Sequence, residues 1–300
     1  MAAALVVAAA EIDPMSTSSS PLGLGIGWRP ELAPAIERRA DIGFVEILAE
    51  DFFLAEAMPA VLERLQQNGV KIVPHGVGLS LGGAEPIDPV RVAALAHLAQ
   101  LVQAPMVSEH IAFVRANGIE TGHLLPVPRT RAMLEILIEN IRQAEAELPV
   151  PLALENISTL FDWPDAEMDE PAFLSEVLAR TEALLLLDIE NIYANARNLG
   201  GDAVAFLESL PLERIGYVHI AGGREVAGIY HDTHTEAIPE EVFALLEELC
   251  ARTVVPGVLL ERDDRFPDEP ALNAEFEAIV GAMHRGQERR LAHEFAHHSA

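Results

Sequence analysis

Residues 184–188 read LLLLD, an uninterrupted apolar run that ends in an aspartate. The same pattern recurs as PLALE at 151–155, GYVH at 216–219 and GVLLE at 257–261. Strands that are buried on both faces, as in parallel sheets, read as continuous apolar runs. Each acidic residue or histidine that closes such a run therefore marks the carboxyl end of a buried parallel strand.

Strand-like and helix-like segments alternate from residue 23 to about residue 284. The predicted strands cover residues 23–28, 44–48, 71–74, 106–108, 151–155, 184–188, 216–219 and 257–261. The predicted helices lie near 30–39, 53–68, 88–102, 129–147, 170–181, 203–210, 239–252 and 269–284. A doubly wound sheet usually has fewer strands and a glycine-rich phosphate turn after the first one. The alternation instead favours the α/β class and a single-domain (β/α)8 TIM barrel.

Short extensions are expected on either side of this domain, which we place at residues 21–285. Residues 1–20 are predicted to form a disordered leader, because a brief apolar run is followed by a serine-rich linker. That run has no preceding Lys or Arg and is too short to span a bilayer, and no other stretch approaches membrane length. Residues 286–300 are predicted to be a tail rich in histidine and arginine.

The charge and the cysteine count exclude several classes of function. Twenty basic residues against 47 acidic ones give a formal charge of −27, which repels phosphate backbones and excludes nucleic acid as an expected partner. The single cysteine, Cys250, excludes an internal disulfide framework and a cysteine-rich metal site. A reducing cytoplasm is the expected compartment.

The carboxyl ends of the predicted strands carry possible metal ligands. These are His75, His110, Glu155, Asp188, His219 and Glu261. The loop after the seventh strand reads HDTH at 231–234. Asp232 and His234 lie two residues apart and share one side of an extended segment, whereas His231 is expected to point away. Because the strands of an α/β barrel deliver their chemistry to one rim, all eight ligands are expected in one cavity.

Four buried carboxylates close together are costly unless cations accompany them. Eight ligands are too many for one ion and suit two or three. Carboxylate and imidazole donors without thiolate fit iron, manganese or zinc, with a preference for iron or manganese. Three further residues form the candidate catalytic set: Glu50 beside the second strand, Asn156 after Glu155, and Arg129, which could hold a substrate carboxylate.

These motifs resemble the multinuclear non-haem iron-dependent oxidases, formerly a domain of unknown function numbered 692, which include peptide-modifying oxidases of methanobactin biosynthesis. The matching strings occur in the family's order over roughly residues 23–265. They are FVEILAEDFF (44–53), HGVGLSLG (75–82), SEHIAF (108–113), LLPVP (124–128), LENIS (154–158), LLDIENIY (186–193), VHIAG (218–222), HDTH (231–234) and LLERD (259–263).

The resemblance implies a TIM barrel that holds two or three iron ions and uses dioxygen to modify residues, often cysteine, of a ribosomally made peptide. It also implies that a small partner protein presents the peptide, and it assigns the iron ligands to the eight positions named above. Two alternatives stay open. One is a zinc- or manganese-dependent hydrolase or sugar isomerase of the endonuclease-IV or xylose-isomerase kind. The other is a non-catalytic barrel that binds a peptide or a metal.

Overall fold

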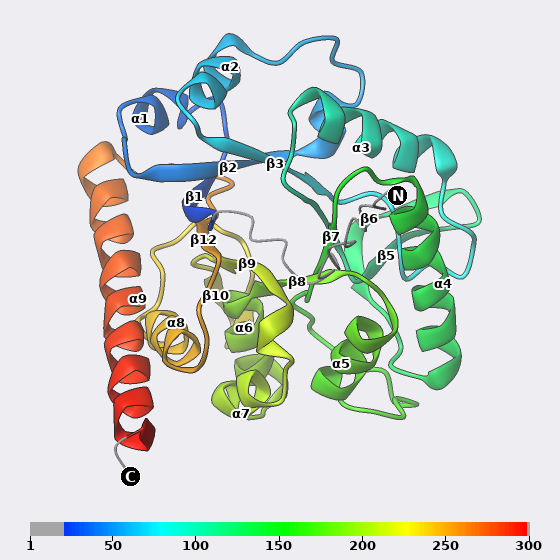
Figure 1. Cartoon of the computed structure of the whole chain (residues 1–300). Helices are drawn as coiled ribbons and strands as arrows, with labels where there is room; N and C mark the ends of the chain where they lie inside the picture. The colour runs from blue at the N-terminus through cyan, green and yellow to red at the C-terminus, as the bar shows by residue number, and fades with distance from the viewer. Residues whose placement is uncertain (1–20, 299–300) are drawn as a thin grey trace, which may run out of the picture.

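The computed structural model describes residues 21–298, and within this part of the chain eight parallel strands close into a barrel surrounded by helices (Figure 1). The barrel strands are β1 Gly23–Gly27, β2 Ile42–Leu48, β3 Lys71–Gly76, β4 Val107–His110, β7 Leu152–Glu155, β8 Leu184–Asp188, β9 Ile215–Ile220 and β12 Gly257–Leu260. They follow one another around the barrel in chain order. The predicted fold class and all eight predicted strands are confirmed. The predicted leader lies outside the described residues.

The helices follow the predicted alternation with two corrections. They are α1 Ala33–Glu37, η1 Ala49–Phe52, α2 Ala60–Gln67, α3 Pro89–Leu101, α4 Arg131–Glu147, α5 Glu170–Arg180, α6 Ile189–Leu199, α7 Ala203–Glu208, η2 Leu212–Arg214, α8 Glu240–Arg252 and α9 Glu269–His298. Helix α6 was not predicted. Asp188 ends β8 and also caps α6, since its Oδ1 accepts a hydrogen bond from Asn191 N at 2.8 Å, so no polar linker marks the boundary.

Helix α9 continues past residue 284, its predicted end, and takes in most of the segment expected to be a separate tail. It packs along α8, at the side of the molecule in Figure 1. Gly286 allows this contact, because a Cβ there would lie 2.4 Å from the carbonyl oxygen of Glu247. Among the described residues, no helix has the length and apolar character needed to cross a bilayer.

Successive side chains of a strand point to opposite faces, so residues two apart share the inner face of the barrel. In several barrel strands, a ligand follows an inward-facing core residue by two positions. In β8, Leu185 and Leu187 pack outward against the helices, while Leu186 belongs to the inner cluster. Asp188 lies two residues further along the same inner face. The same two-residue spacing separates inner core residues from ligands in four other pairs: Val73 and His75, Ala153 and Glu155, Tyr217 and His219, and Leu259 and Glu261. A layer of mostly apolar side chains therefore fills the barrel below a ring of ligands at its carboxyl end.

Two hairpins rise from that end. Strands β5 Ala112–Ala116 and β6 Ile119–Pro126 follow β4, and strands β10 Arg224–Val226 and β11 Ile229–His231 follow β9. The sequence analysis predicted neither hairpin. Both lengthen the connections that leave the ligand-bearing ends of barrel strands, so they form walls around the rim.

Candidate metal centre

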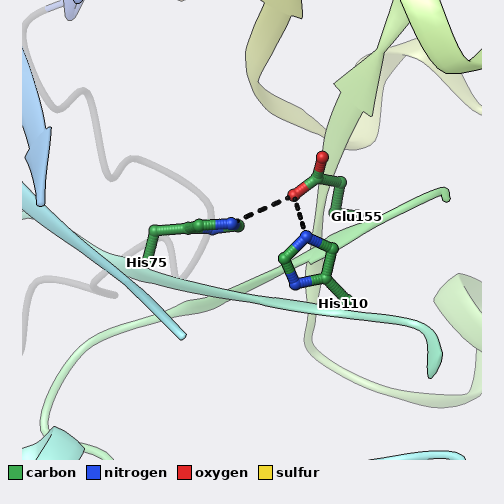
Figure 2. Close-up of side chains that lie close together, drawn as sticks. All are labelled: His75, His110 and Glu155. Atoms are coloured by element: carbon green, nitrogen blue, oxygen red, sulfur yellow. Dashed lines mark ion pairs between the residues drawn. The ribbon is translucent and has the colours of Figure 1, made fainter. Parts of the chain in front are cut away.

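The first group of ligands comes from three neighbouring strands. His75 on β3 and His110 on β4 both point toward Glu155 on β7 (Figure 2). Glu155 Oε2 lies 3.5 Å from His75 Nε2 and 3.2 Å from His110 Nε2. All three side chains are buried. Two imidazole nitrogens and one carboxylate oxygen therefore converge on one point.

The second group shares Glu155 with the first. The other oxygen of Glu155, Oε1, lies 3.4 Å from His219 Nδ1. The same nitrogen lies 3.1 Å from Glu261 Oε2 and 4.0 Å from Asp188 Oδ2. Because Glu155 turns one oxygen toward each group, it belongs to both and would help to hold an ion in each.

The third group lies next to Glu261. His234 Nε2 is 3.7 Å from Glu261 Oε2, 2.5 Å from Asp232 Oδ1 and 3.8 Å from Glu190 Oε2. In each of the three groups the candidate ligand atoms all lie within 4.8 Å of one another. Glu155 and Glu261 thus join three adjacent positions into one array.

A chain of buried hydrogen bonds beneath the first two groups fixes two of the histidines. His75 Nδ1 lies 2.9 Å from Ser108 Oγ, which lies 2.7 Å from Tyr217 Oη. The Tyr217 hydroxyl donates to Glu46 Oε2, and His219 Nε2 lies 2.9 Å from the same oxygen. If every donor points toward the Glu46 carboxylate, His75 Nε2 and His219 Nδ1 keep free lone pairs that face the ligand groups.

The remaining two histidines are held in the same way. His110 Nδ1 lies 3.1 Å from the carbonyl oxygen of Gly76, and His234 Nδ1 lies 2.9 Å from Asp263 Oδ2. Each acceptor favours a proton on Nδ1 and leaves Nε2 as the electron-pair donor. The supporting contacts therefore prepare all four rings for metal coordination.

Buried polar atoms without a hydrogen-bond partner concentrate in these groups. Those that belong to the groups are Glu155 Oε2, Asp188 Oδ2, both carboxylate oxygens of Glu190, His219 Nδ1, Asp232 Oδ1, His234 Nε2 and Glu261 Oε2. Buried polar atoms are normally paired, so a set that faces a common centre calls for bound cations. The donor set of carboxylates and imidazoles suits iron, manganese or zinc.

The pKa shifts of the ion-free site also indicate that these groups hold cations. Burial, and then the charges of Glu155 and Asp232, raise the pKa of Asp188 well above its usual range. Burial opposes charge on His219, but the carboxylates of Glu261 and Glu46 raise its pKa well above its usual range. Protons thus offset part of the buried negative charge, and cations that bind would displace them.

The structure brings all eight predicted ligands into these three groups. It adds Glu190, which the sequence analysis did not include because it lies in the first turn of α6 and not at a strand end. His231, which was expected to point away, lines the cavity above the groups. Asp232 and His234 nevertheless lie in one group, as the sequence analysis expected.

The three predicted catalytic residues lie outside the ligand groups. Asn156 is buried and both ends of its amide bind the backbone of Asp188: Nδ2 donates to the carbonyl oxygen, and Oδ1 accepts from N, each at 2.9 Å. It therefore positions a ligand. The Glu50 carboxylate accepts a hydrogen bond from Val77 N at 3.0 Å and lines an adjoining cavity of about 440 Å³.

Arg129 is also directed away from the ligand groups. Its NH2 group pairs with Asp162 Oδ2 at 2.5 Å, and Nε donates to the carbonyl oxygen of Met168 at 3.2 Å. It lines a neighbouring cavity of about 240 Å³ together with Glu170. The expectation that it holds a substrate carboxylate at the metal centre is therefore not supported by its position.

A cavity of about 390 Å³ opens directly above the centre. Its polar floor includes His110, Glu155, Asp232, His234 and Glu261. Apolar walls come from the β6 hairpin strand and from the loop after β7, namely Leu124, Leu125, Pro126, Leu160 and Phe161. The volume and lining are typical of a site that binds a small group or one side chain of a larger ligand.

Comparison with known proteins finds bacterial relatives over most of the chain. A UPF0276 protein of Streptomyces avermitilis is 49% identical over 275 residues, which cover 89% of this chain and 56% of that protein. The chain thus spans little more than half the length of that relative. A UPF0276 protein of Chromobacterium violaceum is 36% identical over 271 residues, which cover 89% of this chain and 98% of that protein.

Solved structures share the barrel at low sequence identity. A D-tagatose 3-epimerase-like protein aligns over 89% of this chain and 99% of its own, with 16% identity and a TM-score of 0.60. An IOLI protein with a binding zinc atom aligns over 87% and 98%, with 14% identity and a TM-score of 0.58. At these identities the likeness shows the fold alone.

One family model matches residues 23–284, which include the whole barrel and every ligand described above. Its description is RiPP precursor modification enzyme MbnB/TglH/ChrH, where RiPP denotes a ribosomally synthesised and post-translationally modified peptide. The chain belongs to this family of enzymes that modify peptide precursors.

Proposed function

We propose that this protein is an iron-dependent oxidase that uses dioxygen to modify a residue, often cysteine, of a ribosomally made peptide. One observation carries the proposal: three adjacent groups of unpartnered carboxylate and imidazole donors form the floor of an open cavity. Family membership supplies the class of substrate. Iron held by these residues would supply the redox chemistry with dioxygen that such a modification needs.

The protein's own residues would bind and orient the reacting side chain. The walls formed by Leu125, Leu160 and Phe161 can pack against the apolar part of a peptide and exclude water from the floor. The floor presents its donors at the base of the cavity, so a thiol or carboxylate that enters would lie directly against the centre. The buried hydrogen bonds below hold His75 and His219 in place while the substrate changes.

We also propose that a separate small protein presents the peptide at this rim. The mouth carries exposed apolar side chains that a partner or a peptide could cover. Leu160 is 54% exposed and Phe161 is 44% exposed. Val226 and Ile229, in the hairpin that follows β9, are 48% and 43% exposed.

Anaerobic purification followed by metal analysis tests the proposal. We expect two or three irons per chain, and oxygen uptake that depends on a candidate peptide encoded beside the gene. His219→Ala should lose metal and uptake while the barrel stays folded, whereas His97→Ala, on the exposed face of α3, should match the parent. Zinc or manganese without any reaction toward oxygen, together with turnover of a ketose sugar, would instead indicate the sugar-isomerase alternative.

A further inference from the structure

A second cavity, of about 440 Å³, adjoins the one above the metal centre. We call it the Glu50 pocket, and its charged lining residues are Glu50, Arg91 and Glu120. It lies between the short helix η1, the loop after β3, helix α3 and strand β6. The two cavities share His123 and Leu124 of β6 as lining residues. A peptide whose reacting side chain enters the first cavity therefore has a neighbouring side chain within reach of the second.

The carboxylate of Glu50 has unused hydrogen-bonding capacity. Its Oε1 accepts a hydrogen bond from Val77 N at 3.0 Å, whereas Oε2 is buried and has no hydrogen-bond partner. Burial, and then the charge of Glu109, raise the pKa of Glu50 above its usual range. Glu109 offers no relief, because its two oxygens already accept hydrogen bonds from Leu79 N and His110 N, both at 2.8 Å. A ligand that brings a donor and a positive charge would remove this cost.

The one guanidinium that lines the pocket pairs with other carboxylates. Arg91 NH2 lies 3.1 Å from Glu120 Oε1, and Arg91 Nε lies 3.9 Å from Asp88 Oδ2. A Cβ at Gly78 would lie 2.6 Å from Arg91 NH1 and 2.7 Å from Glu50 Oε1, so glycine lets both side chains approach the loop after β3. Two carboxylates line the pocket against one guanidinium. The lining therefore has a surplus of one negative charge, which Glu50 carries.

We propose that the Glu50 pocket takes a positively charged side chain, that of lysine or arginine, from a residue of the peptide substrate close to the one that is modified, and that Glu50 selects for it. An ammonium or guanidinium brings the donors that Glu50 lacks, and its charge matches the acidic surplus of the lining. The apolar walls at Val114 and Leu124 can pack against the methylene stem of such a side chain. The proposal rests on the peptide substrate of the proposed function, but it needs neither iron nor oxygen.

Binding of short peptides to the full chain, loaded with Mn²⁺ in the absence of oxygen, tests this proposal. The probes are acetylated hexapeptides with one cysteine and one arginine, which is placed one or two residues before or after the cysteine. Each has a partner peptide with citrulline, the neutral isostere of arginine, at the same position. For at least one placement, we expect titration calorimetry to give about tenfold or more tighter binding of the arginine peptide, because hydrogen bonds between charged groups are worth at least this much.

Three variants show whether Glu50 is the source of that preference. Glu50→Gln keeps an acceptor for Val77 N and removes the charge, so it should bind the two peptides of a pair about equally. Glu56→Gln, an exposed glutamate between η1 and α2, is the matched control and should keep the preference of the parent. If Glu50→Gln does not fold, as judged by circular dichroism, Glu120→Gln on the exposed strand β6 should also reduce the preference, because Arg91 then loses a partner and repels the incoming cation.

Two results would overturn the assignment. One is a preference for arginine that persists in folded Glu50→Gln, since it would then come from the overall acidic charge of the chain. The other is the absence of any preference for arginine over citrulline in the parent at every placement. Iron-loaded protein that keeps the arginine preference but takes up no oxygen would instead count against the oxidase proposal alone.

Discussion

Asp188→Asn separates the cost of the ion-free centre from its capacity to bind metal. Asp188 uses Oδ1 to cap α6, and Oδ2 lies unpartnered among the ligands. Asparagine keeps an oxygen for the cap and replaces the buried carboxyl group with a neutral amide. The change therefore removes one ionisable group from the centre while the helix stays capped.

The sign of the effect in metal-free protein follows from the raised pKa of Asp188. Between the unfolded pKa, near 4, and the higher folded pKa, the folded chain holds a proton that the unfolded chain has lost, so stability falls as pH rises. Asparagine removes that loss. We expect metal-free Asp188→Asn to be more stable than the parent by about 1–3 kcal/mol near pH 8, roughly 2–10 °C in melting temperature. The difference should shrink toward pH 4.

With metal bound, the parent should become more stable than Asp188→Asn. A bound ion stabilises the folded parent by about 2.7 kcal/mol at one hundred times its dissociation constant. Asp188→Asn should gain less, because the second ligand group has lost a charged donor. Calorimetry with and without Mn²⁺ between pH 5 and pH 8 measures both effects.

The matched control is Asp202→Asn, which alters an exposed cap on α7 through Val204 N and leaves the centre intact. Its melting temperature should respond to pH and to Mn²⁺ as that of the parent does. The reasoning would be refuted if metal-free Asp188→Asn were less stable than the parent at pH 8, or if Mn²⁺ stabilised both proteins equally.

Two further changes probe the surroundings of the centre. Tyr217→Phe removes the hydroxyl that joins Glu46 to Ser108, so we expect about 10–100-fold weaker metal binding in a competition titration, and unchanged affinity would contradict the positioning role. Glu170→Gln tests a half-buried carboxyl near Arg129, whose pKa is raised to about 7 by partial desolvation. Because the folded chain holds the extra proton between about pH 4.5 and 7, stability falls across that window, and the variant should gain at most about 3 kcal/mol at pH 8 and nothing at pH 4. If the melting temperatures of parent and variant changed with pH in parallel, the raised pKa of Glu170 would be contradicted.

The barrel could be predicted because strands buried on both faces leave a direct record as continuous apolar runs. Helix α6 left none, since Asp188 ends one element and caps the next without an intervening linker. The two hairpins at the rim were missed because β6 and β10 are largely exposed and leave no long apolar run in the sequence. Arg129 and Glu50 were predicted near the centre from their position along the chain alone. In the structure Arg129 pairs with Asp162, and Glu50 accepts a hydrogen bond from Val77 N.

For the centre, local sequence identified the eight strand-end and loop residues, because a parallel barrel brings the carboxyl ends of its strands to one rim whatever the loops do. Their division into three groups is not encoded locally. It depends on which oxygen of Glu155 faces which histidine, and on contacts such as that between His234 and Glu190, residues 44 positions apart in the chain. Glu190 joins the third group only because packing places Gly223 against its carboxylate, since a glutamate in a first helical turn is ordinarily solvated. The local sequence thus identifies the ligand residues, whereas their arrangement into groups depends on packing between distant segments.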